Sequence, residues 1–481
     1  MLINRKISFL LLISIVLLMS SCGGSSGGGG STPPPSTANE WTWMSGGSTG
    51  NVKGIYGTLG VASTSNAPGS RMWGVSWIDR SGNPWLFGGF GYDSIGKDDE
   101  LNDLWEFNPI TEQWTWMSGS STVVAYGGQP GIYGTLGIAS NGNVPGGRSG
   151  AVSWVDDSRN LWLFGGSGLD SNGDGAWLND LWKFNPTTKQ WTWMSGSSTG
   201  GATGGQPGEY GTIGVASISN VPGGRIGAIS WTDSSGNLWL FGGTDAVLNG
   251  CLNDLWEFNP TNSEWTWVSG SNTANVSGVY GTQGVPDTNN VPGGRSNANS
   301  WIDSSDNLWL FGGNNEYSSG GGNYFNDLWK FNTATKQWTW VSGSSTTNAS
   351  GVYGTLGIST TTNIPGSREG AVNWIDSSGN LWLFGGQGVA SVAGTNGSLS
   401  DLWKFGVTTK EWTWMSGGNT AVSEGVIGQP GVYGTIGVPS DTNFPGFRRQ
   451  AVGWIDNSGN LWFFGGAGEP GIQNDLWRYQ P

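Results

Sequence analysis

Leu161-Trp-Leu-Phe-Gly-Gly166, with Asn179-Asp-Leu-Trp182 and Gln190-Trp-Thr-Trp193 after it, is the stretch that decides the fold of this 481-residue chain. These short motifs recur in the same order along the sequence. Thirty of the 32 tryptophans follow the sixfold pattern, five in each repeat, and the two outside it are Trp73 and Trp177. A repeat this regular indicates one supersecondary unit, copied six times, that buries its apolar face against its neighbours.

Each repeat carries four short strand signals, rich in aromatic and β-branched residues and bounded by Gly, Pro, Asn or Asp. In one repeat they are Arg148–Trp154, Leu161–Phe164, Asp180–Phe184 and Gln190–Met194. The intervening segments have the chemistry of tight turns. No stretch after the N-terminal segment has the period of an amphipathic helix. Four antiparallel strands in each of six units predict an all-β fold, a six-bladed β-propeller.

The two ends of the repeat region predict how the ring closes. The chain ends on Asn474–Tyr479, a third strand with no fourth, and begins its repeats with Glu40–Met44, a fourth strand with no first three. We therefore expect the N-terminal strand to complete the last blade, which would remove exposed strand edges.

The repeat resembles the kelch family, on the Gly165-Gly166 doublet that ends strand two, Trp182 in strand three and Trp191 in strand four. The resemblance extends from about Trp41 to the C-terminus and implies a propeller like the central domain of galactose oxidase. The copper of galactose oxidase needs His and Tyr ligands, whereas this chain has no His. Copper oxidation, His-ligated zinc and Ser-His-Asp hydrolysis are therefore excluded, and we expect no metal and no cofactor.

The N-terminal region predicts export. Residues 1–21 form a lipoprotein signal peptide, residues 22–39 a lipidated Cys22 with a Gly/Ser/Pro tether, and residues 40–481 the propeller. Leu18-Met-Ser-Ser-Cys22 resembles the bacterial lipobox, which implies a lipid anchor in the membrane and a place at the outer membrane or cell surface. An ordinary signal peptide with a chance Cys is the alternative. The net charge of −14, with no Lys/Arg cluster, argues against nucleic acid as a partner.

A ring of arginines is the first candidate site. One Arg lies six residues before the first-strand Trp of every repeat, where it would face the mouth of the central channel: Arg71, Arg148, Arg225, Arg295, Arg368 and Arg448. Such a ring would suit an anionic ligand, because Arg binds carboxylates with two parallel hydrogen bonds. In the alternative, each Arg pairs internally with the Asp that begins strand three, and the equal numbers favour that pairing.

Two further features have a structural and a functional interpretation. Asp170, Asn172 and Asp174 match the first half of a calcium loop, but Leu181 stands where the final Glu is expected, so a plain turn is the better interpretation. The loops that join strand four to the next strand one hold the excess length of each repeat. Loops on a rigid scaffold are the usual place for binding. Their repeated tyrosines, such as Tyr133, indicate packing.

We therefore expect a non-catalytic binding module of the cell envelope, whose long-loop face holds a protein or glycan partner. The alternative is a carbohydrate-active enzyme, because the resemblance also reaches bacterial kelch propellers that isomerise sialic acid. In that case Arg368 and Glu369 would be the catalytic pair, since Glu369 breaks the sixfold rule. A purely structural envelope protein is the third possibility.

Overall fold

The structure, a computed structural model, describes residues 38–79, 81–124, 127–315, 322–392, 394–421 and 430–481. The chain divides into two units, Met1–Ser36 and Thr37–Pro481, and the first lies outside the described residues together with Cys22. The second unit is all-β, as predicted. In the described part of the chain no helix is long and apolar enough to cross a membrane.

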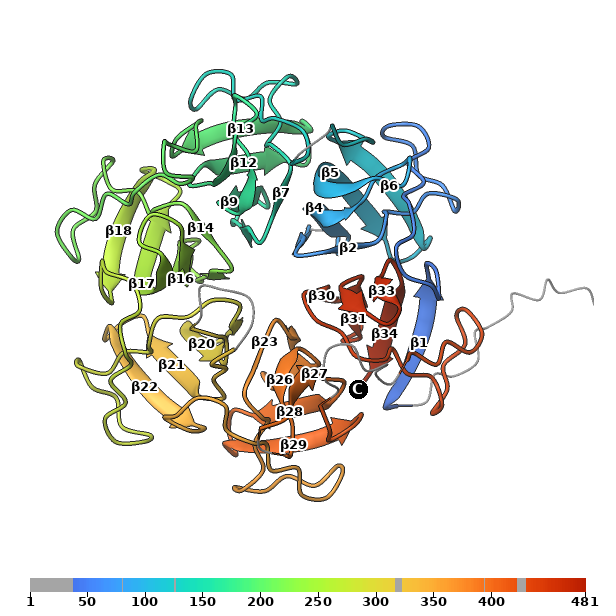
Figure 1. Cartoon of the computed structure of the whole chain (residues 1–481), viewed down its shortest axis with the longest axis vertical. Coiled ribbons are helices and arrows are strands. Elements are labelled where there is room, and N and C mark those ends of the chain that lie inside the picture. The colour runs from blue at the N-terminus through green and yellow to red at the C-terminus, as the bar shows by residue number, and fades with distance from the viewer. Residues whose placement is uncertain (1–37, 80, 125–126, 316–321, 393, 422–429) are drawn as a thin grey trace, which may run out of the picture. The chain divides into compact units, whose positions relative to one another are not determined.

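Within the described residues of the second unit, six antiparallel sheets of four main strands surround a central channel (Figure 1). We number these blades in chain order and give their strands from the channel outward. Blade 1 consists of β3 Val75–Ile78, β4 Pro84–Tyr92, β5 Asp98–Asn108 and β6 Gln113–Ser118, and blade 2 of β8 Val152–Val155, β9 Leu161–Phe164, β12 Leu181–Asn185 and β13 Gln190–Ser195. Blade 3 consists of β15 Ile229–Thr232, β16 Leu238–Asp245, β17 Gly250–Asn259 and β18 Glu264–Ser269, and blade 4 of β19 Asn299–Ile302, β20 Asn307–Phe311, β21 Leu328–Asn332 and β22 Gln337–Ser342. Blade 5 consists of β24 Val372–Ile375, β25 Leu381–Phe384, β28 Leu402–Gly406 and β29 Glu411–Ser416, and blade 6 of β30 Val452–Ile455, β31 Leu461–Phe464, β34 Leu476–Gln480 and β1 Glu40–Ser45.

The ring closes as predicted. β1, the first strand of the described chain, pairs antiparallel with β34, the last, so that Trp41 lies opposite Tyr479. Trp41 is buried and packs on Phe384 of blade 5 at 5.2 Å between ring centroids. The N-terminal strand therefore supplies both the outer edge of blade 6 and part of the core that joins blade 6 to blade 5.

Two of the predicted strands differ from expectation near the channel mouth. The predicted first strand is interrupted in every repeat, because the residue two positions after its Arg has a positive φ, as at Gly150. The Gly-Gly doublet does not always end the second strand, since β4 and β16 run through it. Beyond the doublet the chain forms small extra ladders at the mouth, from the strands β2 Arg71–Met72, β7 Arg148–Ser149, β10 Ser167–Leu169, β11 Gly175–Trp177, β14 Arg225–Ile226, β23 Arg368–Glu369, β26 Gln387–Val389, β27 Asn396–Ser398, β32 Ala467–Gly468 and β33 Gly471–Ile472.

The apolar cores lie between neighbouring blades. The core between blades 2 and 3, for example, brings Phe164 of β9 against Trp265 of β18, with ring centroids 5.6 Å apart. Aromatic pairs in such tilted or edge-on arrangements contribute about 0.5–1.5 kcal/mol each beyond the area they bury. The repeated tryptophans therefore hold the blades to one another, which explains why their spacing predicts the whole ring.

The long loops lie in a different place from the one the sequence suggests. The loop that enters blade 2 crosses its outer strand β13, where the Gly137 amide donates to the Trp193 carbonyl at 2.8 Å and the Asn143 side chain to the Trp191 carbonyl at 3.1 Å. The other blades repeat this contact, and Figure 1 shows the loops projecting outside the outer strands. The repeated part of each loop thus covers an otherwise open strand edge. The apolar tips of these loops, such as Leu136 and Ile138, stay exposed.

Candidate binding site at the channel mouth

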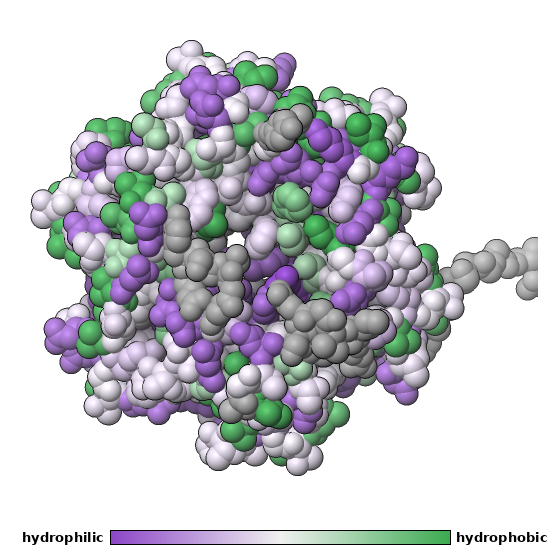
Figure 2. Space-filling model, viewed as in Figure 1, coloured by the Kyte–Doolittle hydropathy of each residue, from purple (hydrophilic) through white to green (hydrophobic). Residues whose placement is uncertain are grey.

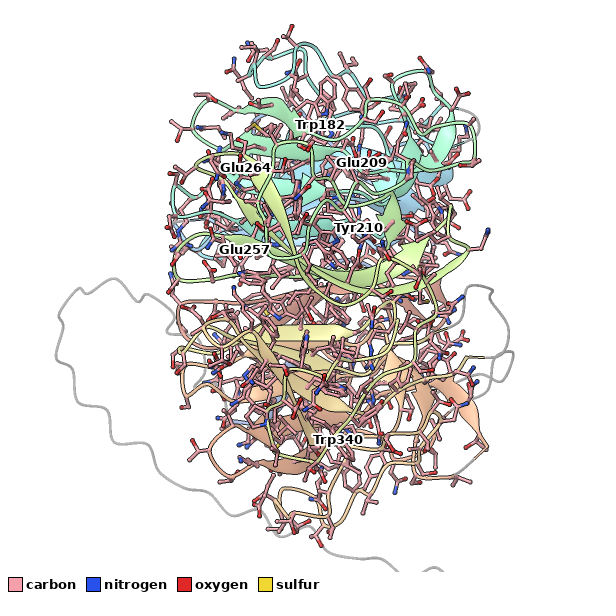
Figure 3. The ribbon with its side chains drawn as sticks, turned by 90° about the vertical axis from the view of Figure 1, so that its left-hand side faces the viewer. Trp182, Glu209, Tyr210, Glu257, Glu264 and Trp340 are labelled. Carbon is pink, nitrogen blue, oxygen red and sulfur yellow. The ribbon has the colours of Figure 1, made fainter. Side chains whose placement is uncertain are left out.

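The six arginines are buried in ion pairs with the strand-three aspartates. In five blades both guanidinium Nη atoms bind both carboxylate oxygens, with Nη1–Oδ1 distances of 2.6 to 2.8 Å. In blade 2, Asp180 also accepts hydrogen bonds from Tyr133 at 2.7 Å and Trp182 at 2.6 Å. Arg148 gives its remaining donors to the Gly165 and Gly146 carbonyls. This geometry matches the alternative in which each Arg pairs internally with an Asp. The loop tyrosines bind the same aspartates: Tyr210 of blade 3, labelled in Figure 3, donates its hydroxyl to Asp254.

The ion pair of blade 6 is less complete than the others. Arg448 contacts Asp475 through Nη2 alone, and its Nε and Nη1 have no hydrogen-bond partner among the described residues. The Arg448 side chain is nevertheless buried. Burial outweighs the neighbouring arginine and raises the pKa of Asp475, whereas Asp401 of blade 5 has a lowered pKa because Arg368 and the Tyr353 and Trp403 hydrogen bonds outweigh burial.

A closed circle of backbone hydrogen bonds surrounds the channel mouth, close to the repeated arginines. One residue of each blade donates its amide to the carbonyl of the preceding blade, at 2.7 to 3.0 Å, and all of them have φ between 54° and 65°. We call this circle the mouth belt; it consists of Trp73, Gly150, Gly227, Asn297, Gly370 and Gln450. Glycine reaches this left-handed conformation without strain, but other residues rarely adopt it. The belt therefore explains the split first strands, and it holds non-glycine residues in blades 1, 4 and 6.

A cluster of polar side chains lies beside the belt on one side of the mouth. Glu369 of β23 accepts hydrogen bonds from the side-chain amides of Asn297, at 3.1 Å, and Asn314. Burial raises the pKa of Glu369, while these amides and the charge of Arg449 act in the opposite direction. We call these four residues the mouth arc: Asn297, Asn314, Glu369 and Arg449. Figure 2 shows hydrophilic residues around the central opening.

The structure separates the two members of the predicted catalytic pair. Arg368 and Glu369 are neighbours in β23, but Arg368 turns inward to Asp401 while Glu369 joins the arc at the mouth. The cation that acts on Glu369 is Arg449 of blade 6. Arg449 stands at the position of blade 6 that is equivalent to Glu369, one residue past the repeated Arg. A comparison of this position across the six repeats could therefore have identified both residues from the sequence.

A second carboxyl group with a raised pKa lies near the opposite side of the mouth. Burial, together with a hydrogen bond and the charge of Asp99, raises the pKa of Glu100 to about 7. The side chain of Ser149 in β7 hydrogen-bonds to Glu100 and acts in the opposite direction. Glu100 belongs to the second-to-third-strand hairpin of blade 1, so the sixfold pattern contains no counterpart that would have identified it.

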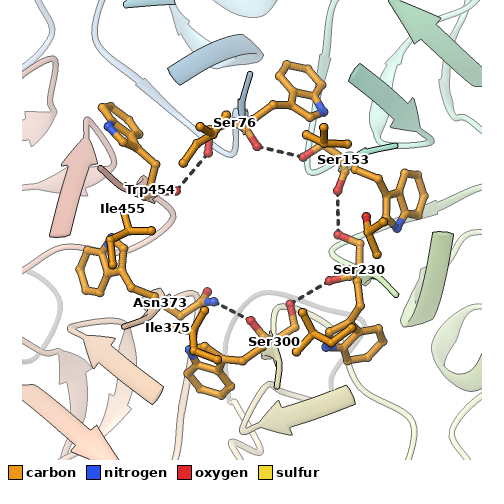
Figure 4. Close-up of a pocket in the computed structure, with 18 residues that line it drawn as sticks. Ser76, Ser153, Ser230, Ser300, Asn373, Ile375, Trp454 and Ile455 are labelled. Atoms are coloured by element: carbon orange, nitrogen blue, oxygen red, sulfur yellow. Dashed lines mark hydrogen bonds between the residues drawn. The ribbon is translucent and has the colours of Figure 1, made fainter. Parts of the chain in front are cut away.

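Below the belt, the channel wall is a ring of side chains that hydrogen-bond from blade to blade (Figure 4). Ser153 donates to the Ser76 carbonyl at 3.3 Å, and Asn373 donates its amide to the Ser300 carbonyl at 2.7 Å. Blade 6 has Gly453 at this position, and a Cβ there would lie 2.6 Å from Val372. The cavity at this level measures about 400 Å³ and is lined by the first-strand tryptophans and by residues such as Ile375 and Ile455.

The calcium-loop motif forms a turn. Asp170 Oδ1 accepts the backbone amides of Asn172 at 2.8 Å and Asp174 at 2.9 Å, and its other oxygen accepts the Gly200 amide at 2.9 Å. Asp93 of blade 1 makes the same three kinds of contact, which identifies a repeated structural turn. In the part of the chain that the structure describes, no group of three or more acidic, Cys or His residues could hold a metal ion.

The fold and this channel define a β-propeller. The chain matches no protein-family model and no curated protein. Among solved structures it is similar to the one titled "Structure of YjhT", with a TM-score of 0.50 and 15% sequence identity over 85% of this chain and 95% of that chain. At this identity the likeness shows the fold alone.

Proposed function

We propose that this protein is a non-catalytic binding module of the cell envelope that holds a glycan or protein partner at the mouth of its channel. The observation that carries the proposal is the asymmetry of the mouth. In five blades the repeated arginine is paired through both Nη atoms with its aspartate inside the blade, so these five copies have no ion-pairing capacity left for a ligand. The mouth arc instead gathers polar side chains from blades 4, 5 and 6 that no other blade repeats.

The finer assignments belong to the same proposal. The Gly-Gly doublet and the strand tryptophans support a kelch-type propeller. The lipobox-like Leu18-Met-Ser-Ser-Cys22 supports a lipid anchor at Cys22, and with it a place at the outer membrane or cell surface. A tether of Gly, Ser and Pro would let the ring present its mouth at a distance from the membrane.

The test is binding of the purified full chain to a glycan and peptide array, with a matched pair of variants. Arg449→Ser gives blade 6 the residue that blades 2 and 4 carry at that position, Ser149 and Ser296. Ile226→Ser makes the same exchange in blade 3, which contributes nothing to the arc. We expect binding to be lost in the first variant and retained in the second. Equal binding by both would remove the arc from the function.

An enzyme acting on carbohydrate is the second candidate, and Glu369 is the observation that favours it. A carboxyl group whose pKa is raised by burial, and which is held by two side-chain amides, has the chemistry of a general acid or base. Glu369→Gln keeps the shape and removes the acid. Turnover of a sugar by the native chain that this variant loses would favour the enzyme, whereas binding that survives it would favour the module.

A further inference from the structure

Trp73 is the unusual member of the mouth belt. At the equivalent position blades 2, 3 and 5 have glycine, and blades 4 and 6 have the amides Asn297 and Gln450. Trp73 holds φ at 56°, and its side chain is 37% exposed. It is also one of the two tryptophans outside the sixfold pattern, so the packing between blades does not require it.

The chain carries two separate costs at this residue. A bulky L-residue in the left-handed region is strained, and an exposed indole leaves a large apolar surface in water. Glycine, which three blades use at this position, would remove both. Strain kept at a mouth that also gathers the unrepeated polar groups is a feature of ligand sites.

The neighbours of Trp73 indicate the class of ligand. Its amide donates to Gln450, whose own amide donates to Gly370, the residue after Glu369. Two belt steps of hydrogen-bonded backbone lead from Trp73 to Gly370, a path of roughly 10 Å along the belt if each step has the spacing of a hydrogen-bonded strand pair. One exposed indole and a cluster of amide and carboxyl groups are thus spaced for a ligand longer than a single sugar ring.

The charges of the arc favour an uncharged ligand. The positive charge of Arg449 acts on Glu369, so the arc contains one cation and one carboxyl group of opposite charge, and Asn297 and Asn314 add neutral amides. An indole face covers the C–H surface of a sugar ring, while amides and carboxyls bind hydroxyl groups. A protein partner would need a broader surface than one exposed indole and four polar side chains provide.

We propose that the mouth binds a neutral oligosaccharide of two or more sugar rings. This inference rests on the proposed function and selects the glycan rather than the protein as the partner. Trp73 stacks on one ring, and the mouth arc binds the hydroxyl groups of the next. The ligand therefore lies across blades 1, 6 and 5, beside the channel axis.

The experiment measures binding of neutral mono- and oligosaccharides to the purified full chain by calorimetry, at low and high salt. We expect the oligosaccharides to bind more tightly than their single sugars, with little dependence on salt. Trp73→Gly should weaken binding at least tenfold while its melting temperature stays equal or rises. Trp73→Phe should retain most of the affinity, and Ile132→Ala, at an exposed residue of a long loop, should change nothing.

The outcomes separate this inference from the proposed function. Oligosaccharide binding that Trp73→Gly leaves unchanged overturns the site proposed here but leaves a glycan-binding module. Absence of any neutral-glycan binding by the native chain overturns the inference, and a purified protein ligand lost only in Arg449→Ser would still support the module. Salt-sensitive binding of sugar acids alone would also overturn it.

Discussion

Replacing Arg148 by methionine tests whether the buried ion pairs hold the blades together. Arg148 binds both oxygens of Asp180, at 2.7 and 2.8 Å, and both side chains are fully buried. The variant leaves a buried carboxylate with only the Tyr133 and Trp182 hydrogen bonds. Breaking one side of a buried pair costs about 3–5 kcal/mol, because the remaining charge has lost its partner.

The size of the thermal shift follows from the length of the unit. An unfolding entropy of about 2.1 cal/mol/K per residue means that each kcal/mol lowers the melting temperature of a ring this long by roughly 1 °C, if it unfolds as one unit. Arg148→Met should therefore melt about 3–5 °C below the native chain. Lys183→Met, in the same blade but only half-buried, should shift it by less than about 1 °C.

The double variant Arg148→Met with Asp180→Leu tests whether the loss in Arg148→Met comes from the unpaired carboxylate. Removing both charges takes away the unpaired carboxylate but orphans the Tyr133 hydroxyl and the Trp182 indole, so it should recover part of the loss. Scanning calorimetry on the native chain, both single variants and the double gives the coupling between the two side chains. A single variant as stable as the Lys183 control would refute the argument that the pair is structural.

Three further predictions concern the ends and the mouth of the ring. Deleting residues 40–46 removes β1 and exposes the edge of β34, so thermal melting should show a loss out of proportion to the length removed, together with aggregation; an unchanged melting temperature would contradict the closure. The pKa of Glu100 is raised to about 7, so the stability it contributes is present below its unfolded pKa near 4.5 and is lost as pH rises through 7. Glu100→Gln should therefore be more stable than the native chain at pH 8 and indistinguishable from it at pH 4, in melts run across that range. Trp73→Gly relieves one left-handed residue and should raise the free energy of unfolding in urea by about 1 kcal/mol; a clear loss would mean that the indole packs into the fold.

The tryptophan pattern predicted the strands and the closure because each repeated Trp fills the same place between two blades. It could not predict the route of the long loops, since their bonds to an outer strand depend on backbone groups, such as the Trp193 carbonyl, that leave no mark in the sequence. The candidate site was only partly accessible. Glu369 stands out against the residues at the equivalent position of the other five repeats, but the sequence marks Arg449 only as one of those five and Trp73 only as a tryptophan outside the pattern.

The mouth belt indicates why the residues of a ligand site at this mouth would have to break the sixfold symmetry. Its six amides all donate to belt carbonyls, so none of these six amides is left to donate to a ligand on the channel axis. In five of the six blades the repeated arginine is bound to its aspartate through both Nη atoms. Only side chains that differ between blades can then discriminate a ligand. Because the arc arises from blades 4, 5 and 6 and Trp73 from blade 1, a ligand that contacts both would lie off the channel axis.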